Sequence, residues 1–128
     1  MQNIDGNHIV LDLGNGTYAF YAHLKKGTLK VKPGDKVKKG ETIASLGNTG
    51  NANASRLHFH VMDGASVLGN NGVPYVISNF EYDGQVPVDA FVAADDYLTG
   101  NFGQQRLPKP QPRTNELPLN LAIVNFSD

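Results

Sequence analysis

Three of the four histidines have a residue type and spacing that could do chemistry. His58 and His60 stand two residues apart in the alternating segment 57–63, and His23 lies near the end of a similar segment at 18–24. Side chains at positions i and i+2 of a strand share a face about 7 Å apart, so His58 and His60 project together. Two imidazoles on one face are typical of half a zinc site. Hydrogen-bonded surface histidines also have this spacing, so the spacing alone leaves both interpretations open.

Alternation with period two dominates the chain and predicts an all-β fold that positions these histidines. Segments 8–13 and 18–24 flank Gly14-Asn15-Gly16, where Asn and Gly accept the positive φ of a hairpin turn. In the second segment, strict alternation puts His23 on the face of Ala19 and Tyr21. Further strands are expected at 41–46, 57–63, 73–80 and 117–126, and either a strand at 91–98 or a short helix at 90–98.

The composition fits one compact domain. The chain has 128 residues, 40% hydrophobic side chains and a net charge of -1, which suits one packed core and excludes a disordered chain.

The sequence also excludes several kinds of site and segment. Without cysteine there is no disulfide, thiol catalysis or thiolate metal site. No run approaches the roughly 20 apolar residues that span a bilayer, and the first five residues lack the features of a signal peptide. We therefore expect no membrane span, and the compartment stays open.

We expect a single β domain with a proline-rich insertion. The domain is predicted to cover residues 1–105. A connection over residues 106–118 holds four of the seven prolines. Residues 119–128 are predicted to supply a closing strand of the same domain.

Basic residues are concentrated in one segment, with seven of the eleven between positions 25 and 39. A basic face could bind an anionic polymer, either nucleic acid or a wall polysaccharide. The alternation of Lys30 and Lys32 with apolar neighbours is more typical of a solvated strand edge. Because no aromatic side chain interrupts the run, a base-stacking surface is not indicated, and we expect no nucleic-acid partner.

Five segments over residues 6–63 resemble, in order, the lysostaphin-type zinc endopeptidases that cut peptidoglycan cross-bridges. They are Gly6-Asn7-His8-Ile9-Val10-Leu11-Asp12, Tyr21-Ala22-His23-Leu24, Val31 to Gly40, Leu46-Gly47-Asn48-Thr49-Gly50 and Leu57-His58-Phe59-His60-Val61. The resemblance implies the second part of that family's catalytic domain. Its expected architecture is an antiparallel β-sandwich or barrel-like domain of the duplicated hybrid motif type, with the first strands missing.

The resemblance also implies roles for single residues. His23 matches a catalytic histidine that would bind the attacking water or stabilise the oxyanion. His58 matches the second histidine of the family's His-x-His motif, a zinc ligand. Arg56 stands in place of the first histidine, the base, and a guanidinium cannot accept a proton although it can stabilise an oxyanion. His60 stands where many members of the family have Glu. It would lie next to the zinc ligand His58 and support it.

One departure from the family affects the metal. Its other two zinc ligands come from an upstream His-x-x-x-Asp segment, which this chain starts too late to include. His8 and Asp12 have that spacing, but residues i and i+4 of a strand lie about 13 Å apart, too far to share one ion.

The resemblance implies a zinc-dependent peptidoglycan endopeptidase-like domain that is incomplete or catalytically degenerate as present. We expect the chain alone to be inactive and not to bind zinc tightly. Its partner would be a bacterial cell-wall peptide or peptidoglycan, and a second copy or another protein would complete the sheet. Family members are typically exported or lie in the cell envelope.

Two alternatives come from other classes. Residues 31–41 also resemble the half-motif of biotinyl and lipoyl carrier domains and of glucose-type phosphotransferase domains. No lysine here has a carrier's setting in a tight hairpin, whereas a phosphohistidine domain could use His23 with His58. The second alternative is a non-catalytic cell-wall binding module that uses the lysine-rich face.

Overall fold

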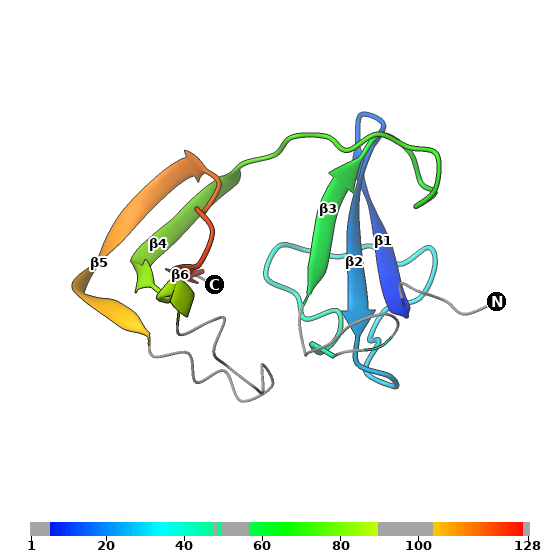
Figure 1. Ribbon diagram of the computed structural model, residues 1–128. Helices are drawn as coiled ribbons and strands as arrows, with labels where there is room; N and C mark the ends of the chain where they lie inside the picture. The colour runs from blue at the N-terminus through cyan, green and yellow to red at the C-terminus, as the bar shows by residue number, and fades with distance from the viewer. Residues whose placement is uncertain (1–5, 48, 50–56, 90–103, 127–128) are drawn as a thin grey trace. The chain divides into compact units, whose positions relative to one another are not determined.

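The computed structural model describes residues 6–47, 49, 57–89 and 104–126. They form two antiparallel sheets of three strands each (Figure 1), which confirms the predicted all-β fold class. The chain divides into two compact units, Met1–Pro74 and Tyr75–Asp128. The domain limits predicted at residues 105 and 118 lie inside the second unit and stay a prediction.

The first unit holds three strands in the order β1-β2-β3. They are β1 (Asn7–Gly14), β2 (Thr17–Leu24) and β3 (His58–Met62). Asn15 and Gly16, at the hairpin between β1 and β2, have φ values of 54° and 75°. The predicted hairpin turn is therefore confirmed.

One face of this sheet carries the core of the first unit. Phe20, Ala22 and Met62 are buried, and Val10, Tyr18 and Val67 pack against them. Phe20 is 0% exposed, and burying a side chain of this size contributes about 2–3 kcal/mol. In the β2–β3 register Phe20 lies opposite His60, and Ala22 lies opposite His58. Residues directly opposite each other share a face, so both histidines of β3 stand on the apolar core face.

The strand predicted at residues 41–46 is not a regular strand. This stretch returns in extended form along the end of β2: the Lys25 N–H donates to the Ser45 carbonyl at 2.9 Å, and the Lys30 N–H donates to the Ile43 carbonyl at 2.9 Å. Leu24 and Leu46 form an isolated bridge. The pairing stays irregular because tight turns interrupt the segment between residues 25 and 41.

The second unit contains β4 (Ile77–Gln85), β5 (Gln105–Glu116) and β6 (Ala122–Asn125), in the order β5-β4-β6. The strands predicted at 73–80 and 117–126 correspond to β4 and to the shorter β6. Most of the segment expected to be a connection belongs to β5. Its prolines are compatible with a strand because β5 lies at the sheet edge. The segment 90–98, predicted as strand or helix, lies outside the described residues.

A buried carboxylate links the three strands of the second unit. Asp83 on β4 is 6% exposed, and its Oδ2 accepts hydrogen bonds from Arg106 on β5 and Asn125 on β6. A buried charge needs such partners, because an unpaired one is strongly destabilising. The three side chains therefore connect the central strand β4 to both of its neighbours and provide partners for the buried charge.

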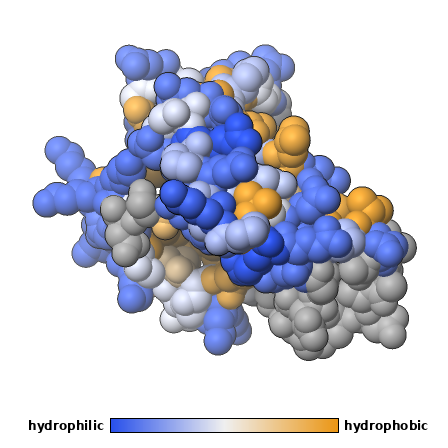
Figure 2. All heavy atoms as spheres, turned by 90° about the vertical axis from the view of Figure 1, so that its left-hand side faces the viewer, coloured by the Kyte–Doolittle hydropathy of each residue, from blue (hydrophilic) through white to orange (hydrophobic). Residues whose placement is uncertain are grey.

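The surface is mixed in character. Hydrophobic side chains form separate groups within a mainly hydrophilic face in Figure 2. Scattered apolar residues of this kind are normal on folded domains. Within the described ranges, no helix has the length and apolar character needed to cross a membrane.

Candidate active site

A bulge in β2 distorts the sheet next to His23. Asn7 and Ile9 of β1 pair with Leu24 and Tyr21 of β2, so β2 has one more residue than its partner over this stretch. His23 has a φ of 62°, in the left-handed region that few residues other than glycine adopt. Bulges commonly redirect a side chain next to a functional site.

The bulge brings His23 to the core face of the sheet. The ring centroids of His23 and His58 lie 5.9 Å apart, and the His58 ring lies 5.8 Å from that of Phe20. The prediction that His23 shares a face with Ala19 and Tyr21 is therefore wrong, because strict alternation does not hold across a bulge. The two histidines singled out for catalysis and metal binding are in fact neighbours.

The orientation of the His23 ring is fixed by a backbone carbonyl. His23 is 5% exposed, and its Nδ1 lies 2.7 Å from the carbonyl oxygen of Thr49. A carbonyl oxygen only accepts hydrogen bonds, so Nδ1 must carry the hydrogen. In the neutral ring Nε2 then has the lone pair, and this nitrogen can accept a proton or bind a metal.

Thr49 is held in place by its own hydroxyl. Its Oγ1 donates to the carbonyl of Leu24 at 2.7 Å and accepts the N–H of Asn7 at 3.0 Å. The approach depends on Gly47: a Cβ there would lie 2.5 Å from the backbone nitrogen of Lys25. Glycine thus lets the segment pass against the end of β2 and bring Thr49 to His23.

The histidines of β3 form a coupled pair. Nε2 of His58 lies 2.9 Å from Nδ1 of His60, so one ring donates a hydrogen bond to the other. The His60 ring lies 4.9 Å from that of Phe20. His60 thus contacts the proposed ligand directly, as the sequence predicts for a supporting residue, although its role in the site stays a prediction.

His8 joins this cluster, which the sequence did not predict. Its ring centroid lies 5.5 Å from that of Phe20, and its Nδ1 lies 3.2 Å from the Gly6 carbonyl oxygen. The signal was available in the hairpin: Val10 pairs with Phe20 across it, and His8 shares the Val10 face by alternation.

The described residues do not make up a complete metal centre. Across residues 6–47, 49, 57–89 and 104–126, no group of three or more His, Asp or Glu side chains could hold a metal ion. Zinc takes three protein ligands at a catalytic site and four at a structural one. The carboxylate of Asp12 accepts the Gly14 N–H at 2.8 Å in the hairpin. The zinc ligand role of His58 therefore stays a prediction, and Arg56 lies outside the described residues.

On the other side of the sheet, Tyr21 packs against Phe59, with ring centroids 5.0 Å apart. Burial raises the pKa of Tyr21, because a phenolate is poorly solvated there. The phenol thus stays neutral and acts as packing behind the histidine face.

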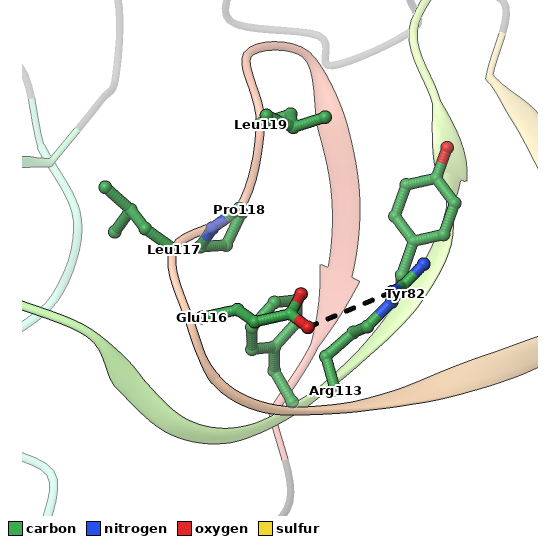
Figure 3. A pocket seen from close by; sticks show the side chains of 7 residues that line it. Tyr82, Arg113, Glu116, Leu117, Pro118 and Leu119 are labelled. Atoms are coloured by element: carbon green, nitrogen blue, oxygen red, sulfur yellow. Dashed lines mark ion pairs between the residues drawn. The ribbon is translucent and has the colours of Figure 1, made fainter.

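A pocket of about 270 Å³ lies within the second unit. Figure 3 shows Tyr82, Arg113 and Glu116 around it, with Arg113 and Glu116 paired at 3.9 Å. Leu117, Pro118 and Leu119 complete the part of the lining that the view labels. Because its two charges face each other, this pocket offers mainly apolar and aromatic contacts.

Comparison with known proteins assigns the chain to a peptidase family. Residues 1–72 match the sequence model of peptidase family M23. This stretch is more than half of the chain, so the chain belongs to this family, and the resemblance to lysostaphin-type peptidases is confirmed. The chain is also 39% identical over 57 residues to the peptidoglycan DD-endopeptidase ShyA of Vibrio cholerae. The matched stretch covers 44% of this chain and 13% of that relative. No solved structure matches significantly.

Proposed function

We propose that the first unit is a peptidoglycan endopeptidase-like domain that acts on the peptide part of the bacterial cell wall. The observation that carries this proposal is the placement of His23. A bulge turns it to within 5.9 Å of His58, and Thr49 fixes its tautomer. Family membership and the similarity to a peptidoglycan DD-endopeptidase support the substrate class.

In this proposal His23 is the residue that handles the proton. Its Nε2 would accept a proton from the attacking water or donate a hydrogen bond to the developing oxyanion, and its fixed ring would avoid reorganisation during the reaction. His58 would bind zinc together with ligands outside the described residues, and the metal would polarise the scissile carbonyl when bound. His60 would hold the His58 ring through their hydrogen bond.

We further propose that this chain is a weak or inactive hydrolase by itself. Arg56 stands at the position where the resemblance implies a base, and a guanidinium stays protonated at any accessible pH. Family membership favours the peptidase interpretation over the phosphotransferase and carrier alternatives.

The proposal is tested with the full chain and purified cross-linked peptidoglycan, with and without added zinc. Release of cleaved cross-links is followed by chromatography and mass spectrometry. We expect little release by the natural chain or by Arg56→His alone, because His58 is one zinc ligand and the resemblance implies two more from an upstream His-x-x-x-Asp segment. In a fusion that supplies such a segment upstream, Arg56→His should raise release by at least about tenfold, since a general base contributes roughly 100-fold or more. His23→Ala in that background should abolish the gain. If no peptide bond is cut by the fused Arg56→His variant with zinc, the hydrolytic proposal fails.

A further inference from the structure

The lysine-rich segment folds into three turns of one design. They are Lys25-Lys26-Gly27-Thr28, Lys32-Pro33-Gly34-Asp35 and Lys38-Lys39-Gly40-Glu41. In each, the fourth residue's N–H donates to the first residue's carbonyl, at 3.2, 3.1 and 3.0 Å respectively. The glycine in third position has a φ of 76°, 92° or 83°, as a type II turn requires. Five of the seven lysines of this segment therefore stand on a backbone that a turn defines.

The acidic side chains of this segment form hydrogen bonds with the backbone. Oδ2 of Asp35 accepts the Lys32 N–H at 3.0 Å, and Oε2 of Glu41 accepts the Lys38 N–H at 2.8 Å. Both ion pairs found among the described residues lie in the second unit. With seven lysines and two carboxylates, residues 25–41 have a net charge of +5, and no lysine of this segment forms an ion pair among the described residues.

We call this surface the lysine face. It consists of seven exposed side chains, Lys25, Lys26, Lys30, Lys32, Lys36, Lys38 and Lys39. It begins two residues after His23, where the chain leaves β2, and the Lys25 N–H bonds to the Ser45 carbonyl at 2.9 Å. The start of the lysine face is thus anchored beside the candidate active site.

We propose that the lysine face binds a flexible anionic polymer of the cell envelope, one that carries phosphates or carboxylates along its chain. The envelope location of this partner rests on the proposed function. An ammonium group is a compact point charge that binds phosphate or carboxylate without demanding one fixed geometry. Several such charges in a row suit a polyanion that can bend to follow them.

The composition of the face argues against nucleic acid. Residues 25–41 contain no arginine and no aromatic side chain. Arginine supplies the forked donors common in base-edge recognition, and single-strand binding uses aromatic stacking, so both of these contributions are missing here. The partner polymer would be held near His23 mainly by charge, which makes the interaction strongly salt-dependent, and its flexibility would let it follow the three turns where a stiff DNA duplex could not.

The test measures binding of the full chain to four soluble probes by titration calorimetry at several salt concentrations. The probes are poly(glycerol phosphate), polygalacturonate, neutral dextran and double-stranded DNA. We expect the first two to bind more tightly than dextran and DNA, with an affinity that falls steeply with salt. Whichever of the two binds more tightly identifies phosphate or carboxylate as the group recognised. Equal binding to dextran, or tighter binding to DNA at matched charge, would overturn the proposal.

Variants separate the lysine face from general charge. The triple change Lys25→Gln, Lys32→Gln and Lys38→Gln should weaken binding roughly tenfold at low salt and lower the salt slope by about 2. Lys109→Gln, which removes one exposed lysine of the second unit, is the control for a charge outside the lysine face and should change neither. An equal loss in this control, or full binding by the triple variant, would contradict the proposal.

A further variant tests the role of the acidic caps. Asp35→Asn keeps an oxygen that can accept the Lys32 N–H while it removes one negative charge, so it should bind the polymer at least as tightly. Weaker binding would show that turn geometry, and not charge, controls the interaction. All these measurements need no cleavage, so the binding result stands whether or not the hydrolysis test succeeds, and the two proposals can fail separately.

Discussion

Nδ1 of His23 lies 2.7 Å from the carbonyl oxygen of Thr49, 26 positions further along the chain. This contact decides which ring nitrogen of His23 has the lone pair, and therefore which atom can take part in proton transfer. Because the acceptor is a backbone carbonyl, the tautomer depends on the position of the loop and on no side chain that titrates. The side chain of Thr49 matters because it holds that loop.

Thr49→Val should destabilise the first unit by about 1–3 kcal/mol, because it leaves the Asn7 N–H without its acceptor and removes the donor to Leu24. It should also loosen the His23 ring. Urea denaturation measures the first effect, and ¹⁵N chemical shifts of the His23 imidazole measure the second. Thr49→Ser retains the hydroxyl and is the control. Unchanged imidazole shifts in Thr49→Val would show that the loop keeps its place without these bonds.

His23→Gly should be more stable than His23→Ala by about 1 kcal/mol, because a residue with a side chain is disfavoured at the φ of 62°. In a regular strand position the order would be reversed, since glycine lowers strand stability. Thermal unfolding of the two variants measures the difference. A more stable alanine variant would show that the bulge relaxes once the imidazole is removed.

Gly47→Ala should cost about 1–3 kcal/mol, because a Cβ would meet backbone atoms of Lys25 and Leu24 at 2.5–2.8 Å. We expect it to displace Thr49 from His23 as well, and so to reduce any hydrolytic activity gained by the fused Arg56→His variant. The control is Gly72→Ala, where no atom lies within 4 Å of the added Cβ. Equal unfolding free energies for the two variants would contradict the close approach.

Asp63 should make stability depend on pH in acid. Hydrogen bonds from the backbone and side chain of Asn71 lower its pKa below the ordinary value of 3.8. Because the pKa of Asp63 is lower in the folded chain than in the unfolded chain, its ionised form stabilises the fold. This stabilisation is fully present above the pKa of the unfolded chain and is lost as the pH falls through the pKa of the folded chain. Asp63→Asn should therefore be less stable than the natural chain at pH 7, and the two should converge in stability as the pH falls below about 4. A constant difference from pH 7 to pH 2 would assign the effect to packing.

The sequence predicted the strands of the first unit and the pairing of His58 with His60, because alternation and i, i+2 spacing are local properties. It placed His23 on the wrong face, because strict alternation fails at the bulge. There β2 has one residue more than β1 between the pairs Asn7–Leu24 and Ile9–Tyr21. It also gave no indication that Thr49 orients the ring, because this contact joins segments that are distant in sequence. The expected connection at 106–118 is mostly strand, since an edge position tolerates proline where a central strand does not.

Pro108, Pro110 and Pro112 alternate along β5, which has a neighbour on one side only in its sheet. Proline has no amide hydrogen, so none of these three residues can donate to a strand laid along either side of β5. A strand from another molecule laid along β5 would therefore find few donors there. Within this sheet, addition of strands to build a fibril is therefore disfavoured at the β5 edge and less hindered at the short, proline-free edge of β6.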